Sequence, residues 1–381
     1  MDKKVTIGNY QICTKCIMDT SDPGIQFDRN EVCNHCKEYE QRINKEVHYD
    51  LAGQERFKRI IDKIKEEGKC KKYDCIIGMS GGIDSTILAY HAKNLGLRPL
   101  AVHLDNGWNT ALAVNNLKKA LKKLGIDLYT YVLDWESFRD LQLSFLKASV
   151  ANSELPTDHA IISILYHTAA KQNVRYILTG SNTVTEGIFF KGWIYDEKDW
   201  KFIKGIHEKF GELKLKNFRH LALCDWIYYI FVKRIKWLPL LNYIPYVKKE
   251  VKEFLKKEFD WEDYGEKHYE SIYARFLQGY ILLTKFGFDR RRAYLSALIC
   301  SGQITREGAL AEMEKKPYPT EEMLKNDKNY IIKKFRLSED EFERIMISPI
   351  KTFKDYSNNS LWFIKMRFLL KLVKKIATHN Y

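Results

Sequence analysis

A glycine-containing loop between an apolar strand and a helix is the first feature with the residue types for chemistry. The stretch IIGMSGGIDSTILAYHAKN starts at residue 76. Glycine permits a tight turn and a close approach of ligand to the main chain. A helix N-terminus adds free N–H groups and a positive dipole end. We therefore expect a phosphate cradle at the carboxyl end of a strand. Its residues are Ser80, Gly81, Gly82, Asp84 and Ser85.

The carboxylate in this loop needs its own explanation, because Asp84 would repel a phosphate group. It makes chemical sense if it caps the following helix or holds Mg²⁺ against the phosphates. The loop lacks the Gly-Lys-Ser/Thr ending of a Walker A loop and the three-glycine dinucleotide pattern. An ordinary turn with a capping Asp and Ser is the alternative interpretation.

Two C-x2-C pairs near the N-terminus have the spacing of a metal site. Four thiolates in this arrangement suit tetrahedral Zn²⁺, and a closed four-sulfur shell indicates a structural role. Free thiols and an iron–sulfur cluster are the alternatives. The predicted ligands are Cys13, Cys16, Cys33 and Cys36.

Alternating strands and helices must position the glycine loop. The hydrophobic pattern predicts strands over 73–79, 98–105, 127–133 and 175–180, and helices over 85–95, 110–124, 135–149 and 158–172. Strand–helix alternation with short links predicts an α/β fold, a parallel sheet with helices on both faces.

The regular alternation fades after residue 190, so three regions are expected. They are a zinc-binding knuckle over 1–50, a nucleotide-binding domain over 51–190 and a mainly helical region over 191–381. Within the last region, residues 220–247 mix aromatic and basic side chains. We favour a buried core or subunit contact there, with a membrane-interface contact as the alternative. The basic amphipathic tail near 361–375 carries the same alternatives, or docks a partner.

The overall composition narrows the class of protein. A net charge of +14 and a pI of about 9.1 predict a polyanionic partner, such as a nucleotide, a phosphorylated sugar, nucleic acid or anionic lipid. The N-terminus shows no signal-peptide pattern, and no apolar stretch is long enough to cross a membrane. A cytoplasmic location is therefore expected, with the eight cysteines present as thiols or metal ligands.

The loop sequence SGGIDS resembles the PP-loop of the ATP pyrophosphatases, which have an adenine nucleotide α-hydrolase-like fold. The resemblance implies ATP and Mg²⁺ as cofactors, an AMP-linked intermediate and release of pyrophosphate. The segment LAVHLDNGWN resembles the second strand of that family, which implies that His103, Leu104 and Asp105 lie by the adenine and ribose. The segment LTGSN resembles the later loop that closes around the nucleotide, which implies Thr179 and Gly180.

Most of the chain, residues 10–315, is similar to the N-acetyl sugar amidotransferases of surface polysaccharide (lipopolysaccharide O-antigen) biosynthesis. The resemblance covers the cysteine knuckles, the PP-loop, LTGSNTVTEG and the segment from DYGEKHYESIYARF to SGQITREGAL. It implies conversion of an acetamido to an acetamidino group on a sugar, with AMP and pyrophosphate released, and we expect the sugar to be nucleotide-linked. We expect Asp84 and Glu186 to be catalytic. Further polar candidates for the sugar are Asp158, His159, Lys191, His268, Tyr269, Glu270, Arg275, Arg290, Arg291 and Arg292.

Ammonia must come from elsewhere, because no cysteine has the context of a glutaminase nucleophile. The resemblance implies separate glutaminase and cyclase-like subunits as partners, and no nucleic acid. A tRNA-thiolating enzyme is the competing hypothesis: it shares the PP-loop and would explain the basic charge, but it usually needs a pair of reactive cysteines near the loop. A third hypothesis is a zinc-bearing binding module with a degenerate nucleotide site.

Overall fold

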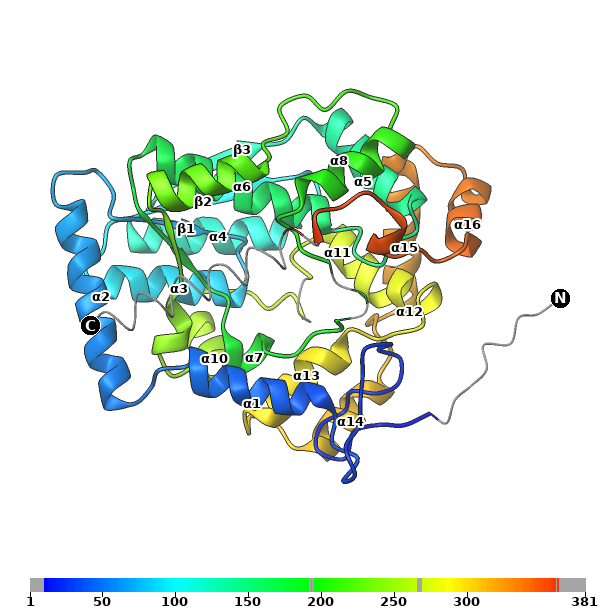
Figure 1. Ribbon diagram of the computed structural model, residues 1–381, viewed down its shortest axis with the longest axis horizontal. Helices are drawn as coiled ribbons and strands as arrows, with labels where there is room; N and C mark the ends of the chain where they lie inside the picture. The colour runs from blue at the N-terminus through cyan, green and yellow to red at the C-terminus, as the bar shows by residue number, and fades with distance from the viewer. Residues whose placement is uncertain (1–9, 192, 194, 266–268, 361, 363–381) are drawn as a thin grey trace.

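The computed structural model describes residues 10–191, 193, 195–265, 269–360 and 362 (Figure 1). The predicted amphipathic tail near 361–375 lies almost entirely outside these residues, as does the sugar-site candidate His268.

A five-stranded parallel sheet forms the centre of the fold, in the order β3-β2-β1-β4-β5. The α/β prediction is therefore confirmed, and four of the five strands fall where the hydrophobic pattern predicts them. The fifth, β5, lies inside the aromatic-basic segment and was not predicted. The strands are β1 (Cys75–Gly78), β2 (Pro99–Asp105), β3 (Asp127–Val132), β4 (Tyr176–Thr179) and β5 (Lys236–Pro239).

Helices cover both faces of the sheet at its central strands, where β1, β4 and most of β2 are buried. In β1, Ile76 packs against α6 (Leu155–Lys171) on one face. Its neighbour Ile77 packs on the opposite face against α3 (Ile83–Asn94) and α4 (Ala111–Leu124). Side chains alternate along a strand, so two apolar layers grow from one continuous apolar run. The predicted two-sided cover is confirmed.

The helices begin and end at residues with clear local reasons. Helix α4 starts after Thr110, whose side-chain oxygen accepts a hydrogen bond from Ala113 N, and ends at Gly125 in the left-handed conformation. Helix α5 (Trp135–Lys147) starts after Asp134, which caps Ser137 N in the same way. These caps follow the strand ends directly, which keeps the connections short.

The N-terminal knuckle, which leads into α1 (Asn34–Glu46), packs against helices from the far end of the chain (Figure 1). Arg292 on α13 (Arg291–Cys300) forms an ion pair of 2.9 Å with Asp19. Its guanidinium also donates to the carbonyl of Ile17. One apolar cluster accordingly joins residues from all three predicted regions. The division at residues 50 and 190 stays a prediction.

The remainder after residue 190 is mainly helical, as expected. It contains α8 (Trp200–Phe210), α9 (Leu223–Ile227), the π-helical turn η1 (Tyr228–Val232), the 3-10 turn η2 (Leu240–Tyr243), α10 (Lys248–Phe259), α11 (Ile272–Phe276), the π-helical turn η3 (Leu277–Ile281), α12 (Leu282–Thr284), α14 (Arg306–Glu314), α15 (Glu321–Phe335), α16 (Glu339–Ile347) and the 3-10 turn η4 (Phe353–Asp355). Helix α2 (Leu51–Gly68) packs beside the sheet. Among the described helices, none is both long enough and apolar enough to cross a bilayer.

A buried ion pair joins α11 to α15. Two nitrogens of Arg275 donate to the carboxylate of Asp327 at 2.7 and 2.8 Å, and Tyr318 donates to the same carboxylate at 2.9 Å. Both side chains are about a tenth exposed. Removing one partner of a buried ion pair leaves the other charge buried without a partner. The resulting loss of folding free energy exceeds the net contribution of the pair.

We therefore expect Asp327→Ala to lower the free energy of unfolding by about 3 kcal/mol. Lys316→Ala, which breaks the exposed pair with Glu321, is the control and should cost less than about 1 kcal/mol. Denaturant titration of both variants measures the difference. Equal, small losses would show that the buried pair does not stabilise this helix contact.

Candidate functional site

The predicted phosphate cradle lines a cavity of about 270 Å³ at the carboxyl end of β1. The loop after β1 forms one wall, the end of β4 forms another, and residues from the C-terminal half of the chain close it. The loop contributes Ser80, Gly82, Ile83, Asp84 and Ser85, and the region after β4 contributes Gly180, Ser181, Thr185 and Glu186. The far side is Lys248, Tyr264, Gly265, Glu270, Tyr294 and Leu298.

Gly81 is required by the turn. Its φ is +84°, and a Cβ there would lie 2.1 Å from the carbonyl oxygen of Ala113. The Gly81 carbonyl in turn accepts a hydrogen bond of 3.1 Å from the indole of Trp261. The backbone is thus held between α4 and a C-terminal tryptophan, and a side chain at this position would force the loop out of place.

The first turn of α3 places Asp84 in the wall of the cavity. Gly82 is the N-cap and offers no side chain, while Ser85 donates to the Gly82 carbonyl. The Asp84 carboxylate accepts a hydrogen bond from Tyr246. Burial and then the charge of Asp84 raise the pKa of Tyr246 well above its usual value, which keeps that donor proton in place. Asp84 is thus in the first turn and is not the N-cap residue itself, and its role in holding a cation stays a prediction.

The end of β4 touches the same helix turn. A Cβ on Gly180 would lie 2.7 Å from the carbonyl oxygen of Asp84, so only glycine lets the strand end approach this closely. Thr179, next to it, is buried and its hydroxyl lies 2.8 Å from that of Ser181. Gly180 lines the cavity, whereas the Thr179 side chain points its hydroxyl to the loop beside it.

The three residues predicted at the end of β2 lie at the carboxyl edge of the sheet, as expected. The side chains of two of them, His103 and Asp105, form hydrogen bonds with backbone groups. His103 lies between the Met79 carbonyl, 2.7 Å from Nδ1, and the Asn109 side-chain amide, 3.2 Å from Nε2. Asp105 accepts from the backbone of Gly107. Of the described cavities, neither the 270 Å³ one nor the larger one below is lined by His103, Leu104 or Asp105. Their contact with adenine or ribose stays a prediction.

The C-terminal wall of the cavity was largely missed by sequence reasoning. Lys248 begins α10 in a Lys-Lys-Glu run that looks like a solvated surface, yet its ammonium lies 5.4 Å from the ring of Tyr294. Tyr264 approaches the loop so closely that a Cβ on Gly82 would lie 3.1 Å from its hydroxyl. Lys248 and Tyr264 lie far from the glycine loop in the chain, and no spacing or periodicity connects them to it. Only the fold shows that they line the same cavity.

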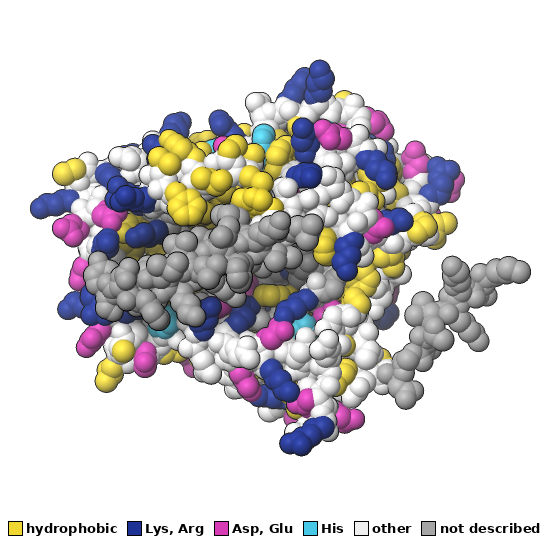
Figure 2. Space-filling model, viewed as in Figure 1, with side chains coloured by type: hydrophobic (Ala, Val, Ile, Leu, Met, Phe, Trp, Pro, Cys, Tyr) yellow, Lys and Arg dark blue, Asp and Glu magenta, His cyan; other side chains and the backbone are white. Residues whose placement is uncertain are grey.

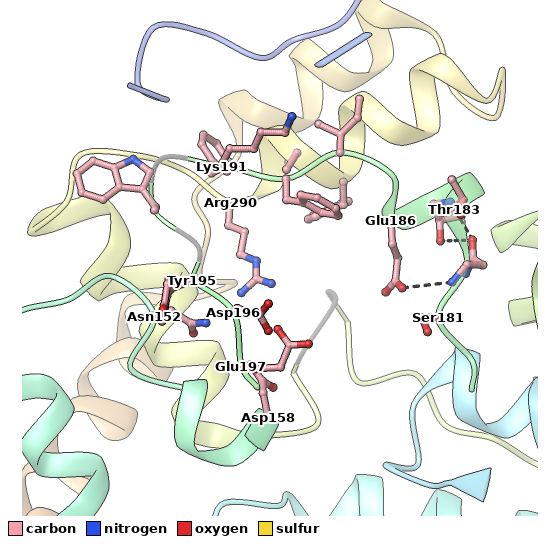
Figure 3. A pocket seen from close by; sticks show the side chains of 18 of the residues that line it. Asn152, Asp158, Ser181, Thr183, Glu186, Lys191, Tyr195, Asp196, Glu197 and Arg290 are labelled. Carbon is pink, nitrogen blue, oxygen red and sulfur yellow. Dashed lines mark hydrogen bonds between the residues drawn. The ribbon is translucent and has the colours of Figure 1, made fainter. Parts of the chain in front are cut away.

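A larger cavity of about 740 Å³ adjoins the first. The two share Ser181, Thr185, Glu186 and Tyr294. Glu186 ends the short helix α7 (Thr183–Glu186), and its carboxylate accepts from the backbone of Asn182 at 3.4 Å. Figure 3 shows Glu186 on one side of this cavity, facing a group of charged side chains on the other. The predicted catalytic Glu186 therefore stands where the two cavities meet.

Arg290 leads that charged group. Figure 3 shows its guanidinium directed toward Asp196 and Glu197, above Asp158. Burial lowers the pKa of Arg290, while the charges of Asp158, Glu186 and Glu154 oppose that shift. Its two neighbours in the predicted basic run point elsewhere, because Arg291 pairs with Asp289 and Arg292 pairs with Asp19. Only Arg290 of the three can meet a ligand in this cavity.

Asp158 is the second titratable group of the larger cavity. Its side chain faces the open space of the cavity, and the walls of the cavity surround it with protein. The surrounding protein, followed by the charge of Glu197, raises its pKa to about 7. Such a carboxylate exchanges protons near neutral pH.

The remaining sugar-site candidates divide into cavity residues and structural residues. Glu270 lines the smaller cavity and Lys191 the larger one, where Lys191 also pairs with Glu38. His159 is held between the Glu197 carbonyl and the Leu221 N–H, and burial lowers its pKa to about 4, which indicates a neutral structural ring. Tyr269 donates to the Pro317 carbonyl, and Arg275 is committed to Asp327.

The four predicted zinc ligands form one buried cluster. All four sulfurs lie within 4.8 Å of one another, and the separations Cys13–Cys36, Cys16–Cys33 and Cys33–Cys36 are 3.8, 3.7 and 3.7 Å. A tetrahedron with Zn–S bonds of about 2.3 Å has edges of about 3.8 Å, so the donor set fits Zn²⁺. Backbone N–H groups of Cys16 and Cys33 point at the Cys13 sulfur, as thiolate ligands require.

A fifth cysteine lies beside this cluster, which the sequence did not indicate. The sulfur of Cys300, at the end of α13, is 3.9 Å from that of Cys36. Arg306 on α14 donates to the carbonyls of Cys13 and Cys16. The knuckle thus braces the helix α13 that carries Tyr294 and Leu298 into the smaller cavity.

Cys33→Ser is expected to abolish zinc binding and to lower the melting temperature, because the knuckle holds α13. Inductively coupled plasma mass spectrometry and thermal unfolding measure both effects. Cys224→Ser, which changes an exposed cysteine away from the cluster, should leave metal content and melting temperature unchanged. Full metal content in Cys33→Ser would contradict the assigned ligand set.

A pH dependence of stability follows from the buried carboxyl of Glu154, which accepts from Gln142 at 3.2 Å. Burial, followed by the charge of Asp158, raises the pKa of Glu154 from 4.5 to about 8. The folded state then holds a proton that the unfolded state releases, so the contribution of this carboxyl to stability is fully present below pH 4.5 and is lost as the pH rises toward 8.

We expect Glu154→Gln to remove this component of the decline, measured by denaturant unfolding at both ends of that pH window. Glu250→Gln, at an exposed position on α10, should keep the decline of the parent protein. An unchanged slope in Glu154→Gln would mean that the carboxyl is already ionised in the fold.

Comparison with known proteins agrees with the C-terminal part of the resemblance. Residues 270–370 match the family described as "LPS biosynthesis protein WbpG-like, C-terminal domain". A stretch of 118 residues, 29% of this chain, is 28% identical to the tRNA-specific 2-thiouridylase MnmA 2 of Fusobacterium nucleatum subsp. nucleatum. That match spans 34% of the relative, about a third of its length.

Solved structures with some likeness include the NMN synthetase from Francisella tularensis, at 18% identity and a TM-score of 0.38, covering 76% of this chain and 98% of that one. Another is the NH3-dependent NAD synthetase from Campylobacter jejuni subsp. jejuni, at 14% identity and a TM-score of 0.30, covering 78% and 98%. Scores this low say nothing about the chemistry of this chain. The chain thus joins an SGGIDS loop at the carboxyl edge of a parallel sheet to a C-terminal region similar to WbpG-like lipopolysaccharide biosynthesis proteins, as the family resemblance predicts.

Proposed function

We propose that this chain is an ATP-dependent amidotransferase of lipopolysaccharide biosynthesis that converts the acetamido group of an N-acetyl sugar into an acetamidino group. The observation that carries the proposal is the junction of two cavities at Ser181, Thr185, Glu186 and Tyr294. The smaller cavity has the glycine loop and helix end of a phosphate cradle. The larger has the size and the mixed polar lining of a small-molecule site. The match of residues 270–370 supports the pathway.

In the first step, the amide oxygen of the sugar attacks the α-phosphorus of ATP and pyrophosphate leaves. The main-chain N–H groups around Gly82 and the dipole of α3 would bear the phosphate charge. Mg²⁺, held by Asp84 with Glu186 or Glu270 nearby, would neutralise charge on the phosphates. The amide loses its N–H proton as the O-adenylyl imidate forms, and Glu186, which lines both cavities, would accept it.

In the second step, ammonia adds to the imidate carbon and AMP leaves with the former amide oxygen. The nucleophile must arrive as NH3, so an ammonium ion has to give up a proton first. Asp158, with its pKa of about 7, is suited to take it near neutral pH. Arg290 stands close enough to Asp158 and Glu186 for its charge to act on both, and it would orient a polar group of the sugar.

The ammonia supply remains part of the proposal. All eight cysteines belong to the described residues, and none lines either cavity, so the cavities hold no thiol nucleophile for glutamine hydrolysis. We propose separate glutaminase and cyclase-like subunits, with free ammonium as a substitute in vitro. A cytoplasmic location, where nucleotide-linked sugars and ATP are available, belongs to the same proposal.

A tRNA-thiolating enzyme is the second candidate, favoured by the partial likeness to a 2-thiouridylase and by the net charge of +14. Thiolation proceeds through cysteine persulfide chemistry beside the activated base. Cys75 is buried within β1, Cys70 and Cys224 are on the surface, and the other five surround the metal site. The placement of the cysteines therefore favours the amidotransferase.

The deciding assay follows conversion of ATP to AMP with ammonium and a panel of UDP- and CMP-linked N-acetyl sugars. Product mass should show an amide oxygen replaced by an imine NH. Asp84→Asn should cut AMP formation by about 10² or more, because phosphate charge loses its cation partner. Asp260→Asn, at an exposed carboxylate, is the matched control.

Zinc content should stay intact in both variants. Unchanged turnover in Asp84→Asn would remove the role of this carboxylate. Pyrophosphate release that depends on tRNA and a sulfur donor, with no response to any sugar, would replace the proposal by the thiolation hypothesis.

A further inference from the structure

A cluster of exposed apolar side chains lies on the aromatic-basic segment. Helix α9 runs directly into the π-helical turn η1, and five large side chains there are between 42% and 66% exposed. Single exposed apolar residues are ordinary, but a contiguous group marks an interaction site. The five are Ile227, Tyr228, Ile230, Phe231 and Val232. Figure 2 shows a yellow patch at the upper left of this face, bordered by dark blue side chains.

This surface is held in place by inward-facing aromatic residues. Trp226 and Tyr229 are buried, and their ring centroids lie 5.0 and 6.0 Å from that of Tyr166 on α6. Trp237 on β5 stacks on the same Tyr166 at 6.0 Å. The exposed side chains therefore project from a fixed support at the edge of the sheet, and the wide π-turn turns three successive residues outward.

Basic side chains follow the apolar ones without an acidic residue among them. The sequence from 226 to 249 contains no Asp or Glu. Lys233 lies 5.8 Å from the ring of Tyr228, and Lys236 lies 5.5 Å from the ring of Tyr176. Arg234, between them, is exposed and has φ +54°, which ends the helical segment and turns the chain into β5. An apolar ridge with a cationic rim results.

We propose that this ridge, residues 227–236, docks the protein on an anionic phospholipid bilayer. Interfacial segments combine aliphatic and aromatic side chains that enter the headgroup region with Lys and Arg that meet lipid phosphates. A second copy of the chain is the less suitable occupant, because a symmetric contact would bring two cationic rims together. The ridge is a peripheral contact, far shorter than a membrane span.

The ridge lies next to the larger cavity. Trp237 belongs to the cavity lining, and Lys198, another lining residue, lies 5.9 Å from the ring of Trp226 under the ridge. Docking would therefore hold the cavity mouth beside the lipid headgroups. The inference stands independently of the proposed reaction, since it rests on the outer surface of α9, η1 and β5.

The test is co-sedimentation of the purified full-length chain with vesicles of phosphatidylcholine alone and vesicles in which about a third of the lipid is phosphatidylglycerol. We expect binding to the anionic vesicles only. The triple variant Ile230→Ser, Phe231→Ser and Val232→Ser should lose about tenfold or more in partition coefficient, because its apolar side chains no longer enter the bilayer.

A charge variant distinguishes the effect of the rim charges on vesicle binding from the effect of the protein's net charge. Replacing Lys233, Arg234 and Lys236 by Gln should cost about fivefold in partition coefficient for each residue. Replacing the exposed Lys58, Lys63 and Lys69 on and after α2 by Gln changes the net charge equally and should cost much less. The apolar control is Leu51→Ser with Ile347→Ser, at positions 86% and 80% exposed elsewhere.

Wild-type binding in the ridge variants, or equal losses in the controls, would overturn the proposal. It would equally fall if the chain binds neither vesicle, or if the serine variant turns a dimer into a monomer with vesicle binding unchanged. Turnover of ATP with a free, water-soluble acceptor should be the same in the ridge variants and the parent protein. That measurement keeps a failure of docking distinct from a failure of the proposed reaction.

Discussion

Two close backbone contacts beyond the ends of β1 and β4 govern the candidate site. The loop after β1 packs against α4 at Gly81, and the end of β4 packs against the first turn of α3 at Gly180; neither position has room for a side chain. A Cβ at either position would come within 2.7 Å or less of a carbonyl oxygen. These contacts direct the N-terminus of α3 into the smaller cavity. The segment from Gly180 to Glu186 then continues along the wall of that cavity. Both proposed half-reactions depend on that junction.

The C-terminal half of the chain completes the site from the other side. Tyr264 and Glu270 reach the loop, and α13 carries Tyr294 and Leu298 into the same cavity. The four-cysteine knuckle packs against α13 through Arg292 and supports it at a distance from the chemistry. The knuckle therefore has a structural explanation: its metal would stabilise the wall of the smaller cavity, and no open coordination position is needed for that.

Local sequence patterns predicted the elements whose signals are local. Strand and helix periodicity located β1 to β4 and their helices, because β1, β2 and β4 are buried apolar runs and α4 and α5 are amphipathic helices with side-chain caps. The strand β5 was not predicted, because Lys-Trp-Leu-Pro is short, lies at a sheet edge and is surrounded in the sequence by aromatic residues. The cysteine cluster was predictable from spacing, but Cys300 was not, because only tertiary packing brings it beside Cys36.

The same limit applies to the charged residues of the site. Arg290, Arg291 and Arg292 form one run in the sequence, but they point in different directions at the start of α13. Arg290 lines the larger cavity, Arg291 pairs with Asp289, and Arg292 pairs with Asp19 of the knuckle. Lys248 looks like a solvated lysine in the sequence, yet it lines the smaller cavity. Asp158 gains its raised pKa from the protein around the cavity and from Glu197, which are properties of the assembled fold. Residue types suggested the chemistry, and only the structure assigned the partners.

A crystal structure of the chain with Mg²⁺, a non-hydrolysable ATP analogue and an N-acetyl sugar nucleotide tests the central claim most directly. The account predicts the phosphates against the main chain at Gly82, with the acetamido oxygen facing the α-phosphorus beside Glu186. Nucleotide density outside that cavity, with the loop free of phosphate, would contradict it.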